Sequence, residues 1–89
     1  MNHKHRKVLH ALFAHPISGN IDPRKVEAVL GELGGEMENR HNGRVAVRLN
    51  GQFAEFHFDH HSLSKDQVVH LKKFIEASGI DPERDYPLR

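Results

Sequence analysis

The sequence predicts an α+β domain with the element order α-α-β-β-β-α, in which a three-stranded antiparallel sheet packs against helices. Three observations lead to this fold class. Apolar residues recur at three- and four-residue spacing before residue 34 and again after residue 63, a pattern typical of amphipathic helices. Between those stretches the apolar spacing changes to two, as it does in β-strands. Two Asn-Gly pairs divide this central region into three segments, and Asn-Gly is a strong hairpin signal.

The first helix is expected in an N-terminal segment, residues 1–16. Its apolar stripe predicts a helix from about Asn2 to Ala14. His15-Pro16 should end that helix, because a residue that precedes proline avoids the helical conformation. The rest of the chain then divides into a core, residues 22–80, and a tail, residues 81–89.

The second helix has the clearest start in the chain. Asp22 fits an N-cap, and Pro23 fits the first helical position, where its missing N–H costs nothing. Ile21 and Val26 occupy the two positions of a hydrophobic staple. Gly34-Gly35 is expected to end this helix in the left-handed conformation.

The hairpin turns fix the predicted register of the strands. With Asn50-Gly51 as a two-residue loop, Val45 faces Phe56, and the alternation on both sides agrees. In the first hairpin, a two-residue Asn42-Gly43 loop would bury two charges, Arg40 and Glu38. A three-residue loop that ends at a left-handed Gly43 keeps the charges outside, so we prefer it. The side chains expected to face the helices are those of Val45, Val47, Leu49, Ala54, Phe56 and Phe58. Those expected to face away are Arg44, Arg48, Glu55 and His57.

A third helix is expected from Ser64 to Ser78. Ser64 and Gln67 have the spacing of a capping box, and Gly79 fits the position of a C-cap glycine. The tail after it, residues 81–89, carries two prolines and several charges and is expected to be loosely ordered.

Composition limits the classes of function. Thirteen Lys and Arg against twelve Asp and Glu give a net charge of +1, so any nucleic-acid contact has to come from a local patch. The absence of cysteine excludes disulfides and thiolate zinc sites. Because no apolar run has membrane-spanning length and no signal-peptide core is visible, we expect a cytoplasmic protein with no membrane partner.

One row of basic side chains stands out on the predicted open face of the sheet. The two registers place Arg40 beside Arg44 and Arg44 beside His57. Like charges that face each other across strands are unfavourable, so the row requires an explanation. One explanation is an anion such as a phosphodiester, held by two guanidinium groups and an imidazole. The other is diagonal neutralisation by Glu38 and Glu55.

A second cluster, His57, Asp59, His60 and His61, contains residue types that bind transition metals. Its side chains should diverge, because part of the cluster lies on a strand and part in the following turn. We therefore predict no metal and no cofactor.

The order helix, three antiparallel strands, helix over residues 22–80 resembles the HicA toxins of bacterial toxin–antitoxin pairs. In that family a Gly-Ser-His motif opens the second strand, and its histidine is catalytic. Here the stretch is Gly43-Arg44-Val45. Aligning Gly43 with the serine puts Arg44 at the histidine position, whereas aligning it with the glycine puts Val45 there. We prefer the first alignment because it keeps a basic residue on the open face. The family's Pro-Arg-His segment corresponds loosely to Phe58-Asp59-His60.

The resemblance implies a fold like that of double-stranded-RNA-binding domains, contact with RNA, and a HicB-like antitoxin as partner. The chain looks like a longer branch of the family that lacks the catalytic histidine. If it cuts RNA, we expect a metal-independent endoribonuclease. His57 would act as general acid or base, and Arg40, Arg44 and His60 would hold phosphate. The alternative is a protein-interaction module with neither RNA binding nor enzymatic activity.

Overall fold

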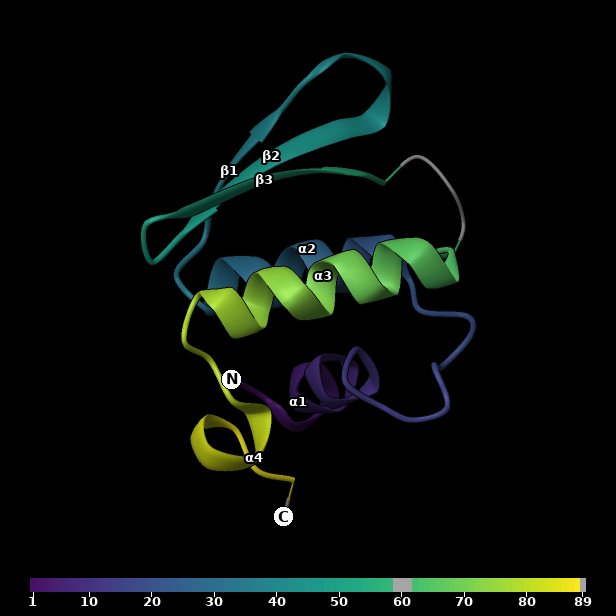
Figure 1. Cartoon of the computed structure of the whole chain (residues 1–89), viewed down its shortest axis with the longest axis vertical. Coiled ribbons are helices and arrows are strands. Elements are labelled where there is room, and N and C mark those ends of the chain that lie inside the picture. Colours follow the sequence, from purple (N-terminus) through teal and green to yellow (C-terminus); the bar gives the residue numbers. More distant parts are fainter. Residues whose placement is uncertain (59–61, 89) are drawn as a thin grey trace.

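A computed structural model describes residues 1–58 and 62–88 of the chain. These residues form an α+β structure with a three-stranded antiparallel sheet and four α-helices, one more helix than the sequence predicts (Figure 1). The elements are α1 (His3–Ala11), α2 (Pro23–Glu32), β1 (Glu36–Asn39), the 3₁₀ turn η1 (His41–Gly43), β2 (Arg44–Leu49), β3 (Gln52–His57), α3 (Lys65–Ala77) and α4 (Pro82–Asp85).

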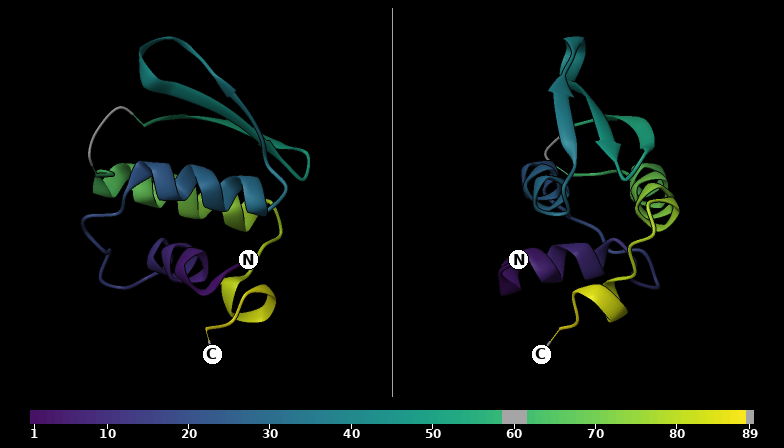
Figure 2. Two further views of the ribbon diagram at one scale, coloured as in Figure 1. Left: turned by 180° about the vertical axis from the view of Figure 1, so that it is seen from behind. Right: turned by 90° about the vertical axis from the view of Figure 1, so that its left-hand side faces the viewer.

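The elements stack in three layers. The sheet, with strand order β1-β2-β3, forms one outer layer. Helices α2 and α3 lie side by side against one face of the sheet, and α1 and α4 lie on the far side of this helix pair (Figures 1 and 2). In the described part of the chain, no helix covers the opposite face of the sheet, which we call the open face.

The register of the strands is the predicted one. Met37 pairs with Val47 in the first hairpin, and Val45 pairs with Phe56 in the second. Gly43 has the expected positive φ of 72°, and Asn42 before it is also left-handed, with φ 63°. The predicted assignment of residues to the two faces is therefore confirmed.

A single apolar core fills the space between the layers. The strands contribute Val45, Val47, Leu49 and Phe56, all nearly inaccessible to solvent. Ala54 and Phe58, which were also predicted to face the helices, are half-buried and pack against the same cluster. The first helix belongs to this core as well, because its Leu9 is fully buried.

The two long helices begin and end where the sequence predicts. The Asp22 carboxylate accepts a hydrogen bond from the N–H of Arg24 at 2.9 Å, and Ser64 Oγ accepts one from the N–H of Gln67 at 3.2 Å. At the end of α2, the N–H of Gly35 reaches the carbonyl of Leu30, as in a Schellman motif. These caps fix the start of both helices and the end of α2.

The predicted end of the first helix was wrong. Helix α1 ends at Ala11 rather than near Ala14. Leu12, buried in the core, is the C-cap, and the N–H of Phe13 bonds to the carbonyl of His10, three residues back, so the chain tightens into a turn there.

The described part of the tail, residues 81–88, contains α4, which packs on α1. Asp81 caps α4 and Pro82 is buried. The imidazole of His10 donates to the carbonyl of Tyr86 at 2.7 Å, which fixes the tail against the first helix.

Candidate functional site

The open face of the sheet is a grid of three rows, each with one residue from each strand. The basic row is Arg40, Arg44 and His57, the acidic row is Glu38, Ala46 and Glu55, and the outer row is Glu36, Arg48 and Phe53. The grid follows from the register, since alternate residues of a strand point to the same face.

The β1–β2 loop positions the basic row. The N–H of Arg40 donates to the carbonyl of Arg44 at 2.7 Å, which extends the pairing of β1 and β2 by one residue. His57 Nε2 lies 2.5 Å from the carbonyl oxygen of Asn42. A carbonyl only accepts hydrogen bonds, so this nitrogen carries a proton, and in the neutral ring the lone pair is on Nδ1. The structure therefore brings together three of the four predicted site residues.

Glutamates of the acidic row neutralise the two arginines. Glu55 lies between them, with one oxygen 3.6 Å from Arg40 Nη1 and the other 4.0 Å from Arg44 Nη1. Glu38 lies 4.0 Å from Arg40 Nη2. Diagonal neutralisation, one of the two explanations that the sequence left open, is thus present in the structure.

These ion pairs are loose. Within the described residues, neither guanidinium group makes a side-chain hydrogen bond, and both lie on the surface, Arg40 with 45% and Arg44 with 63% of the side chain exposed. Exposed pairs at such distances contribute little to stability. The arginine N–H groups consequently remain available to a second anion that offers better geometry.

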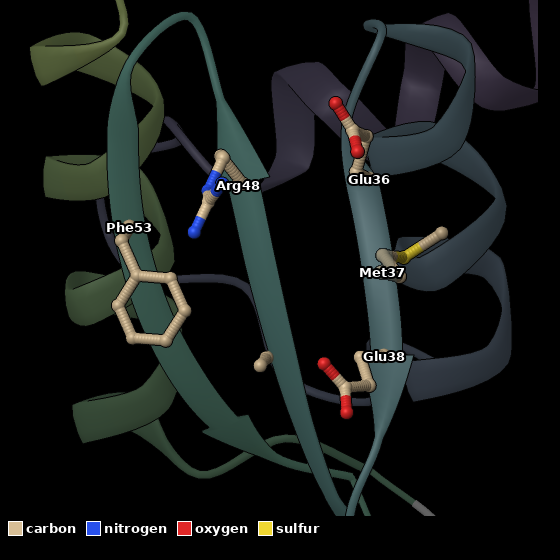
Figure 3. Close-up of a pocket in the computed structure, with 6 residues that line it drawn as sticks. Glu36, Met37, Glu38, Arg48 and Phe53 are labelled. Atoms are coloured by element: carbon tan, nitrogen blue, oxygen red, sulfur yellow. The ribbon is translucent and has the colours of Figure 1, made fainter.

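Two shallow hollows lie on the open face. One, of about 260 Å³, is lined by Arg40, His41, Asn42, Arg44 and Glu55. The other, of about 280 Å³, lies beside Ala46 and is lined by Glu36, Met37, Glu38, Ala46, Arg48 and Phe53 (Figure 3). Ala46 is at the centre of the grid, and its small side chain leaves room between its larger neighbours.

The rest of the histidine cluster falls outside the described residues. Asp59, His60 and His61 belong to the segment that the structure does not describe, so the proposed phosphate contact of His60 stays a prediction. No group of three potential metal ligands occurs in residues 1–58 and 62–88. The prediction that the cluster holds no metal is likewise untested.

The sequence analysis assigned no role to Phe53, a residue of the open face that is 55% exposed. Its position was already contained in the predicted register, which puts Phe53 opposite Arg48.

Comparison with known proteins adds no relative: no family model, no curated protein and no solved structure matches the chain. Among the described residues, no helix has the length and apolar character needed to cross a membrane.

Proposed function

We propose that this protein is a HicA-like RNA-interacting component of a toxin–antitoxin type system and that the basic row binds the phosphate backbone. The observation that carries the proposal is the row itself, two exposed guanidinium groups and an imidazole side by side on an uncovered sheet face. Arginine forks match the oxygens of a phosphate, which makes arginine a preferred phosphate contact.

The order of elements supports the resemblance from which this proposal began. Helix α2, the three strands and α3 follow one another, and both helices lie on the same face of the sheet (Figure 1). The family resembled here has a fold like that of double-stranded-RNA-binding domains. The preferred alignment puts Arg44 at the position of the family's catalytic histidine, in the middle of the basic row.

Glu55 is the main competitor for such a ligand. Its carboxylate contacts both arginines at 3.6 and 4.0 Å without a hydrogen bond. A phosphodiester offers oxygens to the same N–H groups and releases counterions when it binds. Binding of RNA therefore requires the arginines to turn from Glu55 toward the phosphate, which long exposed side chains can do.

His57 is the residue that would carry cleavage. The contact with the carbonyl of Asn42 orients the ring of His57, and hydrogen bonds to backbone carbonyls often orient catalytic histidines in this way. If the protein is a metal-independent endoribonuclease, His57→Ala abolishes cleavage and keeps binding. If it is an inactive relative, neither the wild type nor His57→Ala cleaves RNA, and the slope of log affinity against log salt changes by less than one.

The test of the proposal is a salt titration of RNA binding. Arg44→Ala should weaken binding about equally for all RNA sequences and reduce the slope of log affinity against log salt by about one. Arg24→Ala is the matched control, since Arg24 is a highly exposed arginine on α2, the helix that lies against the covered face of the sheet. Wild-type protein that does not bind RNA at low salt would remove the proposal.

A protein-interaction module is the second candidate, and one observation favours it. The nine residues of the grid include three arginines and three glutamates, so the open face has no net charge when His57 is neutral. Such a face suits another protein, for example a HicB-like antitoxin. This candidate predicts a partner-bound complex whose affinity is nearly independent of salt.

A further inference from the structure

The hollow beside Ala46 differs from the basic row in the groups that surround it. Arg48 extends from β2 toward the side of the ring of Phe53 on β3, and the carboxylate of Glu38 points from β1 toward β2 (Figure 3). Glu36 stands above Glu38 on the same strand, whereas Met37 points away toward α2. A carboxylate, a guanidinium and an aromatic ring thus surround one small space.

Within residues 1–58 and 62–88, the charged groups of the outer row have no ionic partner. In the part of the chain that is described, neither Glu36 nor Arg48 forms an ion pair or a side-chain hydrogen bond, although the two residues are opposite each other on paired strands. Phe53 is one of the exposed large apolar residues, at 55%. An acceptor, a donor and an apolar ring are therefore available to a ligand together.

We infer that this hollow is a subsite for one unpaired RNA base that carries an exocyclic amino group, with the base stacked on Phe53. The inference rests on the proposed function and extends it from the backbone to a base. Aromatic side chains stack on any unpaired base. Glu36 and Glu38 accept hydrogen bonds from the amino group, and Arg48 donates to a ring nitrogen or carbonyl oxygen of the same base.

The chemistry of the bases decides which of them fit. Cytosine presents an amino donor where uracil presents a carbonyl acceptor, and a carboxylate pairs with the first and repels the second. The glutamates, which hinder phosphate binding at this end of the sheet, thus favour an amino-bearing base. Recognition of an amino group thus gives Glu36 and Glu38 a function, which phosphate binding by the basic row does not.

The spacing of the rows allows one strand of RNA to occupy both sites. The outer row lies four residues along the strands from the basic row, which is about 13 Å at about 3.3 Å per residue. A short extended single strand covers this distance and can place a phosphate on Arg44 and a base on Phe53. A paired base in a duplex is stacked between its neighbours and has no free face for Phe53.

The experiment compares two ten-nucleotide RNAs of equal length and charge, one of cytidine and one of uridine, by fluorescence anisotropy at low salt. The wild type should bind the cytidine oligomer several-fold more tightly. Phe53→Ala should weaken this binding by about tenfold, as loss of one stacked base does, and Phe53→Tyr should restore it. Leu88→Ala is the matched control, because Leu88 is another exposed apolar residue and lies in the tail.

Glu36→Ala separates recognition of the base from general charge. Loss of a negative charge should raise the affinity for both oligomers, while the ratio between them falls toward one. Equal wild-type binding of the two oligomers, together with no effect of Phe53→Ala, would overturn the inference and leave the proposed function standing. Absence of binding to either oligomer would overturn both.

Discussion

The two faces of the sheet are made by the same strands, yet different forces act on them. On the covered face, Val45, Val47 and Leu49 are almost completely excluded from solvent. On the open face, Arg44 and Arg48 alternate with them and are exposed. Burying an aliphatic side chain stabilises the fold by roughly 1.5–3 kcal/mol, whereas an exposed ion pair contributes about 0–1 kcal/mol. Stability therefore resides on one face, and the other is free to carry charges that serve binding.

The largest expected effect compares neighbouring residues on β2. Leu49→Ala should lower the free energy of unfolding by about 2–5 kcal/mol, because the residue is 1% exposed and the cavity cannot be filled by solvent. Arg48→Ala should change it by at most about 0.5 kcal/mol. Urea unfolding followed by circular dichroism measures both. Equal losses would show that the open face contributes to stability as much as the core does.

The next largest loss of stability is expected at Gly35, which lies against the backbone of Leu30. Gly35 connects α2 to β1, and a Cβ there would lie 2.7 Å from the carbonyl oxygen of Leu30 and 3.5 Å from Val47 Cγ1. Gly35→Ala should destabilise the fold by about 1–3 kcal/mol, as overpacking does. Gly19→Ala is the control, since nothing lies within 4 Å of its Cβ position. A Gly35→Ala variant as stable as wild type would show that α2 can shift on the sheet.

Substitutions on the open face should change RNA affinity more than they change the free energy of unfolding. Glu55→Gln removes the carboxylate shared by Arg40 and Arg44, and we expect the free energy of unfolding to change by less than about 1 kcal/mol. On the proposed function, RNA affinity should rise, because no carboxylate competes for the arginines. A fall in RNA affinity measured by anisotropy would instead identify Glu55 as a contact and contradict the proposed role of the row.

The smallest expected effect concerns an exposed ion pair that is hydrogen-bonded, unlike those of the open face. A side-chain hydrogen bond from Arg84, together with the backbone N–H of Asp81, lowers the pKa of Asp85 from 3.8 to about 2. Because the folded-state pKa lies below the unfolded value, this stabilisation is present above about pH 4 and disappears as the pH falls toward 2. The stability difference between wild type and Arg84→Gln should therefore shrink between pH 6 and pH 2. A difference in urea midpoint that stays constant across this range would contradict the assignment.

The local signals of the sequence were sufficient for most of the fold. Asn50-Gly51 and the alternation around it fixed the register, because a shift by one residue would move every apolar side chain to the wrong face. The caps at Asp22 and Ser64 were equally local. The same Asp-Pro signal recurs at Asp81-Pro82, where it starts α4, so that helix could also have been predicted from the sequence.

The side chains that share the open face and their order, including the basic row, could be predicted because turn chemistry and strand periodicity act over a few residues. The end of α1, the packing of the tail against it and the contacts between charges could not, because they depend on segments far apart in the chain. Leu12, the C-cap of α1, is buried in a core built from distant segments, and His10 bonds to Tyr86 across 76 positions of sequence. The balance between Glu55 and the two arginines was likewise set by side-chain conformation, because long exposed side chains have several rotamers and the backbone register does not choose among them.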